Sequence, residues 1–140
     1  MSAMELNPPK AKQGEAYMRV MGRLAKSAMS AIADDVSRKI LLATVDLPQT
    51  VLDVSHTQGI PQSTCYRRMT ELVEEGLVVP ERIEVTPEGR YVTYRSSFSA
   101  YRILSDVTGV SVEVVINEGV AEKVHTRWIT MASRIGGVTA

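Results

Sequence analysis

The chain has 140 residues and carries 16 basic against 16 acidic side chains, so its formal net charge is zero. Hydrophobic residues make up 44%, enough for the core of one compact domain, and aromatic residues only 5%, which predicts an aliphatic core. One cysteine excludes an internal disulfide and most cysteine-based zinc sites. The sequence has no apolar run of membrane-spanning length and no signal-peptide pattern, so we expect a cytoplasmic protein without a membrane partner.

Two segments precede the most informative part of the chain. Residues 1–13 predict a disordered arm. Residues 14–33 place apolar side chains at a helical period, and Tyr17, Met21 and Leu24 share the resulting face, so we expect one long helix. That face is broader than a small domain can cover. We therefore expect the helix to pair with a second copy of the chain, and packing inside its own core is the alternative.

Residues 34–98 predict three helices and a β-hairpin in close succession. The first helix covers residues 34–46. The second begins at Thr50, where Asp53 three positions later forms a near relative of the capping box. It ends at Gly59, a residue suited to a left-handed C-terminal cap. The third helix follows almost at once, which predicts a sharp turn between the two.

The third helix, predicted over residues 62–75, has two chemically different faces. Cys65, Met69 and Leu72 form one buried stripe. The opposite face carries polar and basic side chains that suit base edges and phosphates in a major groove. We expect DNA contacts from Thr50 in the preceding helix and from Gln62, Ser63, Thr64, Tyr66, Arg67, Arg68 and Thr70.

A β-hairpin is predicted next. Residues 77–85 and 90–95 contain its strands, and the turn Thr86-Pro87-Glu88-Gly89 joins them with typical turn residues. Arg90 and Arg95 lie on the returning strand, and we expect both to contact the phosphate backbone. The order of helix, turn, helix and hairpin predicts a winged helix-turn-helix, within a fold that is mostly α with small antiparallel β structure (α+β) and is flanked by dimerisation helices.

The same region resembles the winged-helix transcription regulators of the ArsR-like type, particularly archaeal members. The resemblance is carried by Ser37-Arg38-Lys39-Ile40-Leu41, by the segment from Gly59 to Arg68 and by the segment from Leu72 to Val78. It covers residues 34–95 and implies a homodimeric repressor or activator. Metal-sensing relatives use clustered cysteine and histidine on one helix. This chain has one cysteine and two histidines in all, so we expect no metal site.

Residues 99–140 predict a second hairpin and a C-terminal helix. The strands cover about residues 98–104 and 110–117, and an amphipathic helix follows over 120–135. Trp128, the only tryptophan, is expected either to anchor a subunit interface or to pack on the second hairpin. Together the two terminal helices predict a dimer seam formed by Tyr17, Met21, Leu24, Val124, Trp128 and Ile135.

These patterns lead to two functional hypotheses. The first is a sequence-specific transcription regulator that binds a palindromic site in double-stranded DNA as a homodimer. The alternative is a winged helix that binds other proteins within transcription or chromatin machinery, which the zero net charge favours. The polar face of the third helix favours the first hypothesis, since a surface that binds protein would be more apolar.

We expect no enzymatic activity. The sequence has no glycine-rich phosphate loop, and its paired carboxylates, Asp34-Asp35 and Glu74-Glu75, are adjacent and so point to different sides of a helix. His56 and His125 lack companion ligands, which predicts surface histidines. No cofactor is expected, and the sequence identifies no small-molecule effector.

Overall fold

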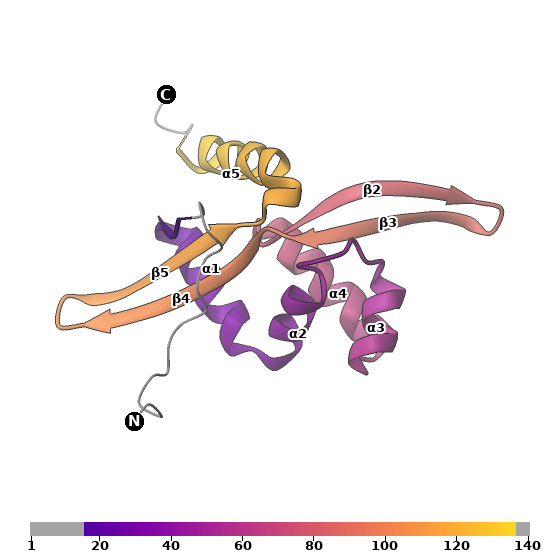
Figure 1. The fold of residues 1–140 in the computed structure, drawn as a ribbon, viewed down its shortest axis with the longest axis horizontal. Coiled ribbons are helices and arrows are strands. Elements are labelled where there is room, and N and C mark those ends of the chain that lie inside the picture. The colour runs from indigo at the N-terminus through magenta and orange to yellow at the C-terminus, as the bar shows by residue number, and fades with distance from the viewer. Residues whose placement is uncertain (1–15, 137–140) are drawn as a thin grey trace.

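The computed structural model describes residues 16–136, with side chains described for residues 16–133. Its fold is α+β, as predicted, with helices and two antiparallel sheets (Figure 1). The predicted arm at residues 1–13 lies outside the described residues. In chain order the elements are β1 (Met18–Val20), α1 (Gly22–Ala33), α2 (Asp35–Ala43), α3 (Val51–Gln58), α4 (Gln62–Glu74), β2 (Val78–Thr86), β3 (Gly89–Ser96), β4 (Phe98–Asp106), β5 (Gly109–Ile116), the short 3₁₀ helix η2 (Glu118–Val120) and α5 (Ala121–Gly136).

Helices α3 and α4 form the predicted helix–turn–helix pair. The Thr50 hydroxyl accepts the Asp53 N–H at 3.0 Å and the Asp53 carboxylate accepts the Thr50 N–H at 3.1 Å, so the capping box is complete. Gly59 ends α3 in the left-handed region at φ +64°, which turns the chain sharply into α4. Helix α2 packs on both, and the arrangement is compatible with a winged helix-turn-helix.

Two β-hairpins extend in opposite directions from the helices, as Figure 1 shows. The first hairpin, β2 and β3, is a separate two-stranded sheet that turns between Thr86 and Gly89, as predicted. Its register shifts between Pro80 and Arg82, where β2 bulges. The second hairpin, β4 and β5, belongs to a three-stranded sheet with the order β1-β5-β4.

The prediction of one helix over residues 14–33 is wrong in its first half. Met18–Val20 forms strand β1, which pairs antiparallel with β5 and places Val20 opposite Val112. Helix α1 starts only at Gly22, whose φ of +60° lies in the left-handed region and breaks the chain between strand and helix. The apolar spacing of so short a segment fits a strand as well as a helix. Gly22 is the sequence feature that indicates a break between the two.

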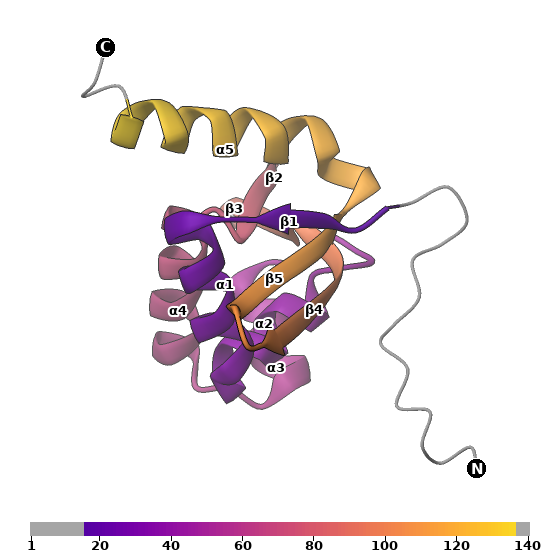
Figure 2. The ribbon, with the colours of Figure 1, turned by 90° about the vertical axis from the view of Figure 1, so that its left-hand side faces the viewer.

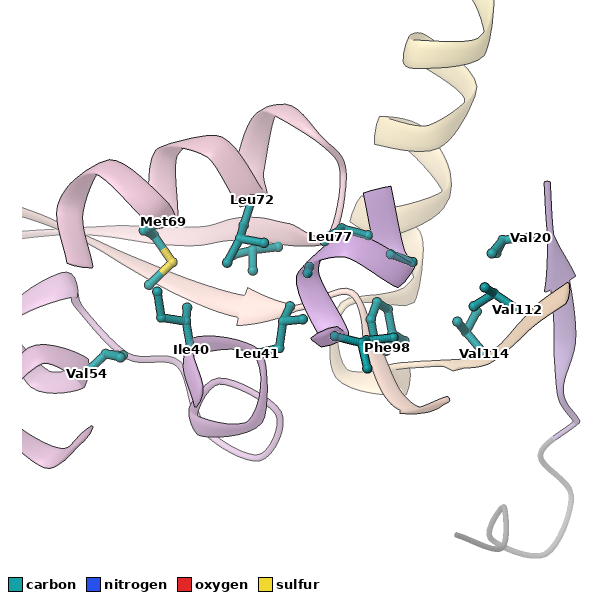
Figure 3. Close-up of a cluster of buried hydrophobic side chains, with 14 of the residues drawn as sticks. Val20, Ile40, Leu41, Val54, Met69, Leu72, Leu77, Phe98, Val112 and Val114 are labelled. Carbon is teal, nitrogen blue, oxygen red and sulfur yellow. The ribbon is translucent and has the colours of Figure 1, made fainter. Parts of the chain in front are cut away.

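A single large core joins the helices to the second hairpin. Figure 3 shows buried side chains from α2, α3, α4, the β2 and β4 starts, β1 and β5 meeting in it. The predicted stripe of Cys65, Met69 and Leu72 is buried, with each residue at most 1% exposed. A smaller cluster of Val79, Val120 and Val124 lies under the start of α5. Because Val124 is buried within its own chain, its predicted place at a dimer seam is wrong.

Cys65 is buried and its thiol lies 3.6 Å from the Val51 carbonyl oxygen, to which it donates. Desolvation raises the pKa of this thiol. We expect Cys65→Ser to keep a partner for its hydroxyl at Val51 and to cost only about 1 kcal/mol of unfolding free energy. Denaturant unfolding of the variant measures this cost. Cys65→Ala, which removes the polar atom altogether, is the comparison. Rapid reaction of native Cys65 with a thiol reagent would contradict its burial.

Candidate nucleic-acid interface

The outer face of α4 presents five of the ten side chains that the sequence predicted to contact DNA. Gln62, Ser63, Tyr66, Arg67 and Thr70 are all exposed, and 64% of Tyr66 is accessible. They share this face because the opposite side of the helix is buried in the core. Among the described residues, the Arg67 guanidinium has no ion pair or hydrogen bond. It is therefore free to bind a ligand outside the chain.

Two threonines of the predicted set, Thr50 and Thr70, have hydroxyl partners within the chain. Thr50 caps α3, as described above. Thr70 donates its hydroxyl to the Tyr66 carbonyl at 3.0 Å, one turn earlier on the same helix, and is otherwise exposed. Thr64 is half-buried. Thr50 thus has a structural role at the helix start.

Arg68 does not lie on the outer face of α4, so its assignment to DNA contact is wrong. Its guanidinium pairs with Asp34 at the start of α2, donates to the Ser37 hydroxyl at 3.0 Å and lies 3.3 Å from the Glu71 carboxylate. The Asp34 carboxylate also accepts the Ser37 N–H, at 2.9 Å. That backbone hydrogen bond, together with Ser37 and Arg68 side-chain contacts, lowers the pKa of Asp34. Arg68 therefore ties α4 to α2.

Arg95 is also turned inward, which corrects its predicted contact with phosphate. Its Nε donates to the Val45 carbonyl at 3.2 Å, its Nη1 pairs with the Glu81 carboxylate at 3.1 Å and its Nη2 donates to Asn117 Oδ1 at 3.4 Å. Only 12% of the side chain is exposed. A single sequence shows an arginine on a strand but not these partners, which come from segments far along the chain.

The first hairpin retains two exposed cations. Arg90 is exposed near the turn, and the Arg82 side chain is 59% exposed although it lies 3.6 Å from Glu81. Glu84 and Glu88 are exposed on the same hairpin and offset this charge. With Arg68 and Arg95 used internally, the positive potential available here is smaller than the sequence predicted.

The base of the first hairpin is fixed beside α3. Gln49, just before α3, and Tyr94 on β3 exchange two backbone hydrogen bonds, at 3.1 and 2.8 Å. Tyr94 is partly buried there, and its burial, with a smaller effect from nearby Tyr66, raises the pKa of its phenol. The contact places the hairpin on the same side of the molecule as the α3–α4 pair.

Two kinds of feature are absent from the residues that the structure describes. Within residues 16–133, no group of three or more histidine, cysteine, aspartate or glutamate side chains is placed to hold a metal ion. In the same part of the chain, none of the helices combines the length and the apolar character needed to cross a membrane. His56 and His125 are exposed, as predicted, and Cys65 is buried.

An apolar groove of about 510 Å³ lies where the sequence predicted a dimer seam. Its walls are β1 with the start of α1 on one side and the second half of α5 on the other, and Figure 2 shows α5 running above β1. Met21 is 73% exposed at this groove and Leu24 is half-buried. The groove is lined by Met18, Arg19, Val20, Met21, Arg23, Leu24, Trp128, Met131 and Ala132.

The remaining residues of the predicted seam have mixed positions. Trp128 is half-buried and donates its indole N–H to the Gly76 carbonyl at 2.7 Å, so it packs on the α4–β2 turn. Tyr17 is half-buried, and the Arg102 guanidinium lies 4.1 Å from the centre of its ring. The side chain of Ile135 lies outside the described residues.

Comparisons with known proteins assign no family to this arrangement. No family model matches the sequence, and no curated protein matches it. The resemblance of residues 34–95 to ArsR-like regulators therefore stays a prediction.

Proposed function

We propose that the protein is a sequence-specific DNA-binding transcription regulator with a winged helix-turn-helix, acting as a homodimer on double-stranded DNA. The observation that carries the proposal is the outer face of α4, where Gln62, Tyr66 and Arg67 are exposed on a helix anchored by its other side, and where Arg67 has no partner among the described residues. Amide and guanidinium groups at the start of an exposed helix are suited to base edges in the major groove.

The first hairpin serves as the wing in this proposal. Arg90 and Arg82 supply exposed charges for the phosphate backbone, and the Gln49–Tyr94 contact keeps the hairpin beside α3. So few free cations predict weak binding by one subunit. Two subunits bound to a palindromic site would double the contacts, which agrees with the homodimer implied by the resemblance to ArsR-like regulators.

The apolar groove between β1, α1 and α5 is the proposed dimer seam. Met21 exposes 73% of its surface there, and Met18 exposes 38%. In this proposal, the second half of the partner's α5 packs into the groove. It is apolar enough to do so, because the same segment forms the apolar wall of the groove in its own chain. A two-fold axis along this seam makes each contact occur twice.

Arg67→Ala is expected to weaken binding to the preferred site by about 1–3 kcal/mol and to relax specificity at one base position. The guanidinium is exposed and has no partner within the part of the chain that the structure describes, so its removal should leave the fold intact. Titration of labelled duplexes with each base at each position measures both effects. Lys26→Ala removes an exposed charge from α1, away from α4, and should leave sequence preference unchanged.

Arg90→Ala is expected to act differently, because a phosphate contact carries no sequence information. The variant should weaken all duplexes alike and lower the slope of log affinity against log salt by about one unit. Affinities measured at several salt concentrations on specific and random duplexes give that slope. Unchanged slopes would exclude Arg90 from the phosphate contacts.

Selection from a random duplex library tests the proposal as a whole. We expect enrichment of a palindrome whose half-sites are about one helical turn, roughly 34 Å, apart. Binding to the selected site should then resist salt better than binding to random DNA. Failure to retain any duplex at low salt would reject DNA as the ligand.

The second candidate function, a protein-binding winged helix, is favoured by exposed apolar side chains on the first hairpin. Ile83 is 55% exposed, Val85 is 76% exposed and Tyr91 is 39% exposed. The double variant Ile83→Ser, Val85→Ser discriminates between the two functions. It should leave DNA affinity nearly unchanged if the hairpin lies along phosphates through Arg90, whereas a protein-binding surface would lose its main apolar contacts.

A further inference from the structure

Four segments of the chain meet at the partly buried Arg95 and the buried Asn117. Arg95 lies at the base of the first hairpin, on β3, and Asn117 lies in the turn between β5 and η2. Arg95 bonds the Val45 carbonyl in the loop after α2, the Glu81 carboxylate on β2 and Asn117 Oδ1. One guanidinium therefore connects the helices, both strands of the first hairpin and the segment that leads into α5.

Both the nitrogen and the oxygen of the Asn117 side-chain amide take part in the same contact. It is 5% exposed, and its Nδ2 donates to the Val45 carbonyl at 2.9 Å and to the Ser96 carbonyl at 3.0 Å. Its Oδ1 accepts the Gly119 N–H at 3.2 Å as well as the Arg95 donor. A buried amide with all these partners is held in one orientation, and it orients Arg95 in turn.

The contact also includes the bulge of the first hairpin. Glu81 lies at the register shift of β2, where its carboxylate pairs with Arg95 and its carbonyl accepts a hydrogen bond from Lys123 of α5. Bulges redirect a strand, so a contact at this point acts on the direction of everything beyond it. Beyond the bulge, Arg82 to Val85 are exposed, and the hairpin runs out from the body in Figure 1.

We propose that Arg95 and Asn117 are positioning residues. They fix the direction of the first hairpin relative to α3 and α4, and they couple this direction to the position of α5. The consequence for DNA rests on the proposed function: Arg90 reaches phosphate only while the base of the hairpin is held. A small rotation at the base moves the distant turn through a large arc, so loss of the contact removes the Arg90 contribution and leaves that of Arg67.

Two variants perturb this contact by different routes. Asn117→Ala removes the amide and its four hydrogen bonds. Gly119→Ala leaves both polar residues in place, but its added Cβ would lie 2.6 Å from Arg95 Nη2, so the guanidinium must shift from the position in which it bonds Asn117. Arg102→Gln is the matched control, because it breaks an arginine–glutamate pair of the second hairpin, the 2.6 Å contact with Glu113, without touching the first.

Distance measurements without DNA test the positioning role directly. Spin labels at Glu88→Cys on the hairpin turn and Thr57→Cys on α3, both exposed, report the direction of the hairpin in a Cys65→Ala background. We expect a narrow distance distribution in the parent and in Arg102→Gln, and a broadened or shifted one in Asn117→Ala and Gly119→Ala. Distributions that match the parent in both folded variants would overturn the proposal. If Asn117→Ala fails to fold, Gly119→Ala alone decides.

A DNA-binding cycle tests the consequence for the interface. In the parent, Arg90→Ala should lower the salt slope by about one unit. In the Gly119→Ala background, Arg90→Ala should leave the slope unchanged, whereas Arg67→Ala should keep its full effect on affinity. A loss of stability alone would weaken the two effects equally, and that result would overturn the proposal. If the parent binds no DNA, the proposed function fails while the label distances still decide the positioning role.

Discussion

A charge at Met21 is expected to convert the protein from dimers to monomers. Met21→Glu places a carboxylate in the apolar groove at a residue that is 73% exposed in the single chain. Because the side chain contributes little to its own core, the variant should fold normally. Self-association should weaken by about 2–4 kcal/mol, the magnitude typical of a central interface residue. Sedimentation at micromolar concentration measures this change, and specific DNA binding should be lost with it.

Leu42→Glu is the matched control for this prediction. Leu42 is 58% exposed on α2, which does not line the groove, so a charge there should leave the dimer intact. Leu24 and Trp128 are poorer test positions, because both pack against the core of their own chain. Dimers that persist in Met21→Glu would reject the groove as the seam, and a monomeric parent protein would reject the homodimer altogether.

The helix–turn–helix pair could be predicted from sequence because its signals are local. The Thr50–Asp53 capping box and the left-handed Gly59 involve residues a few positions apart, and the structure confirms both. The two hairpin turns, at Gly89 and Gly109, are local in the same sense. The buried stripe of α4 follows from helical periodicity alone.

The sequence could not show which polar side chains face inward. Arg68 and Arg95 are used by partners that lie 34 and 50 residues away in the chain, at Asp34 and Val45. Only the fold brings these partners together. As a result, half of the four arginines expected at DNA have structural roles, while Arg67 and Arg90 keep their predicted exposure.

The predicted dimer seam depended on a second kind of information that the sequence lacks. Helical periodicity identifies an apolar face but not the segment that packs on it. Val124 is covered by Val79 and Val120 of its own chain. Strand β1 takes the place of the first turns of the predicted helix because its backbone pairs with β5, a long-range interaction that periodicity does not encode. Fewer apolar residues therefore remain uncovered at the groove than the two apolar faces in the sequence predicted.

Gly76→Ala is expected to cost about 2–4 kcal/mol of unfolding free energy. This cost is larger than that expected for Gly59→Ala, the corresponding change after helix α3. Gly76 has φ +79°, and an alanine in the left-handed region costs about 1–2 kcal/mol by itself. Its Cβ would also lie 2.7 Å from Met131 Sδ and 3.2 Å from Trp128 Cδ1. The Met131 side chain must then shift, and any accompanying movement of Trp128 and α5 weakens the Trp128 hydrogen bond to the Gly76 carbonyl.

Gly59→Ala separates the two costs. Gly59 has a similar φ of +64°, but nothing lies within 4 Å of its would-be Cβ, so only the conformational cost applies. Denaturant unfolding of both variants gives the difference, and the fluorescence of Trp128, the only tryptophan, reports whether α5 has moved. Because Trp128 also lines the groove, a shifted α5 should weaken self-association in Gly76→Ala but not in Gly59→Ala. Equal costs with unchanged fluorescence would mean that α5 does not depend on Gly76 for its position and would contradict the steric part of the prediction.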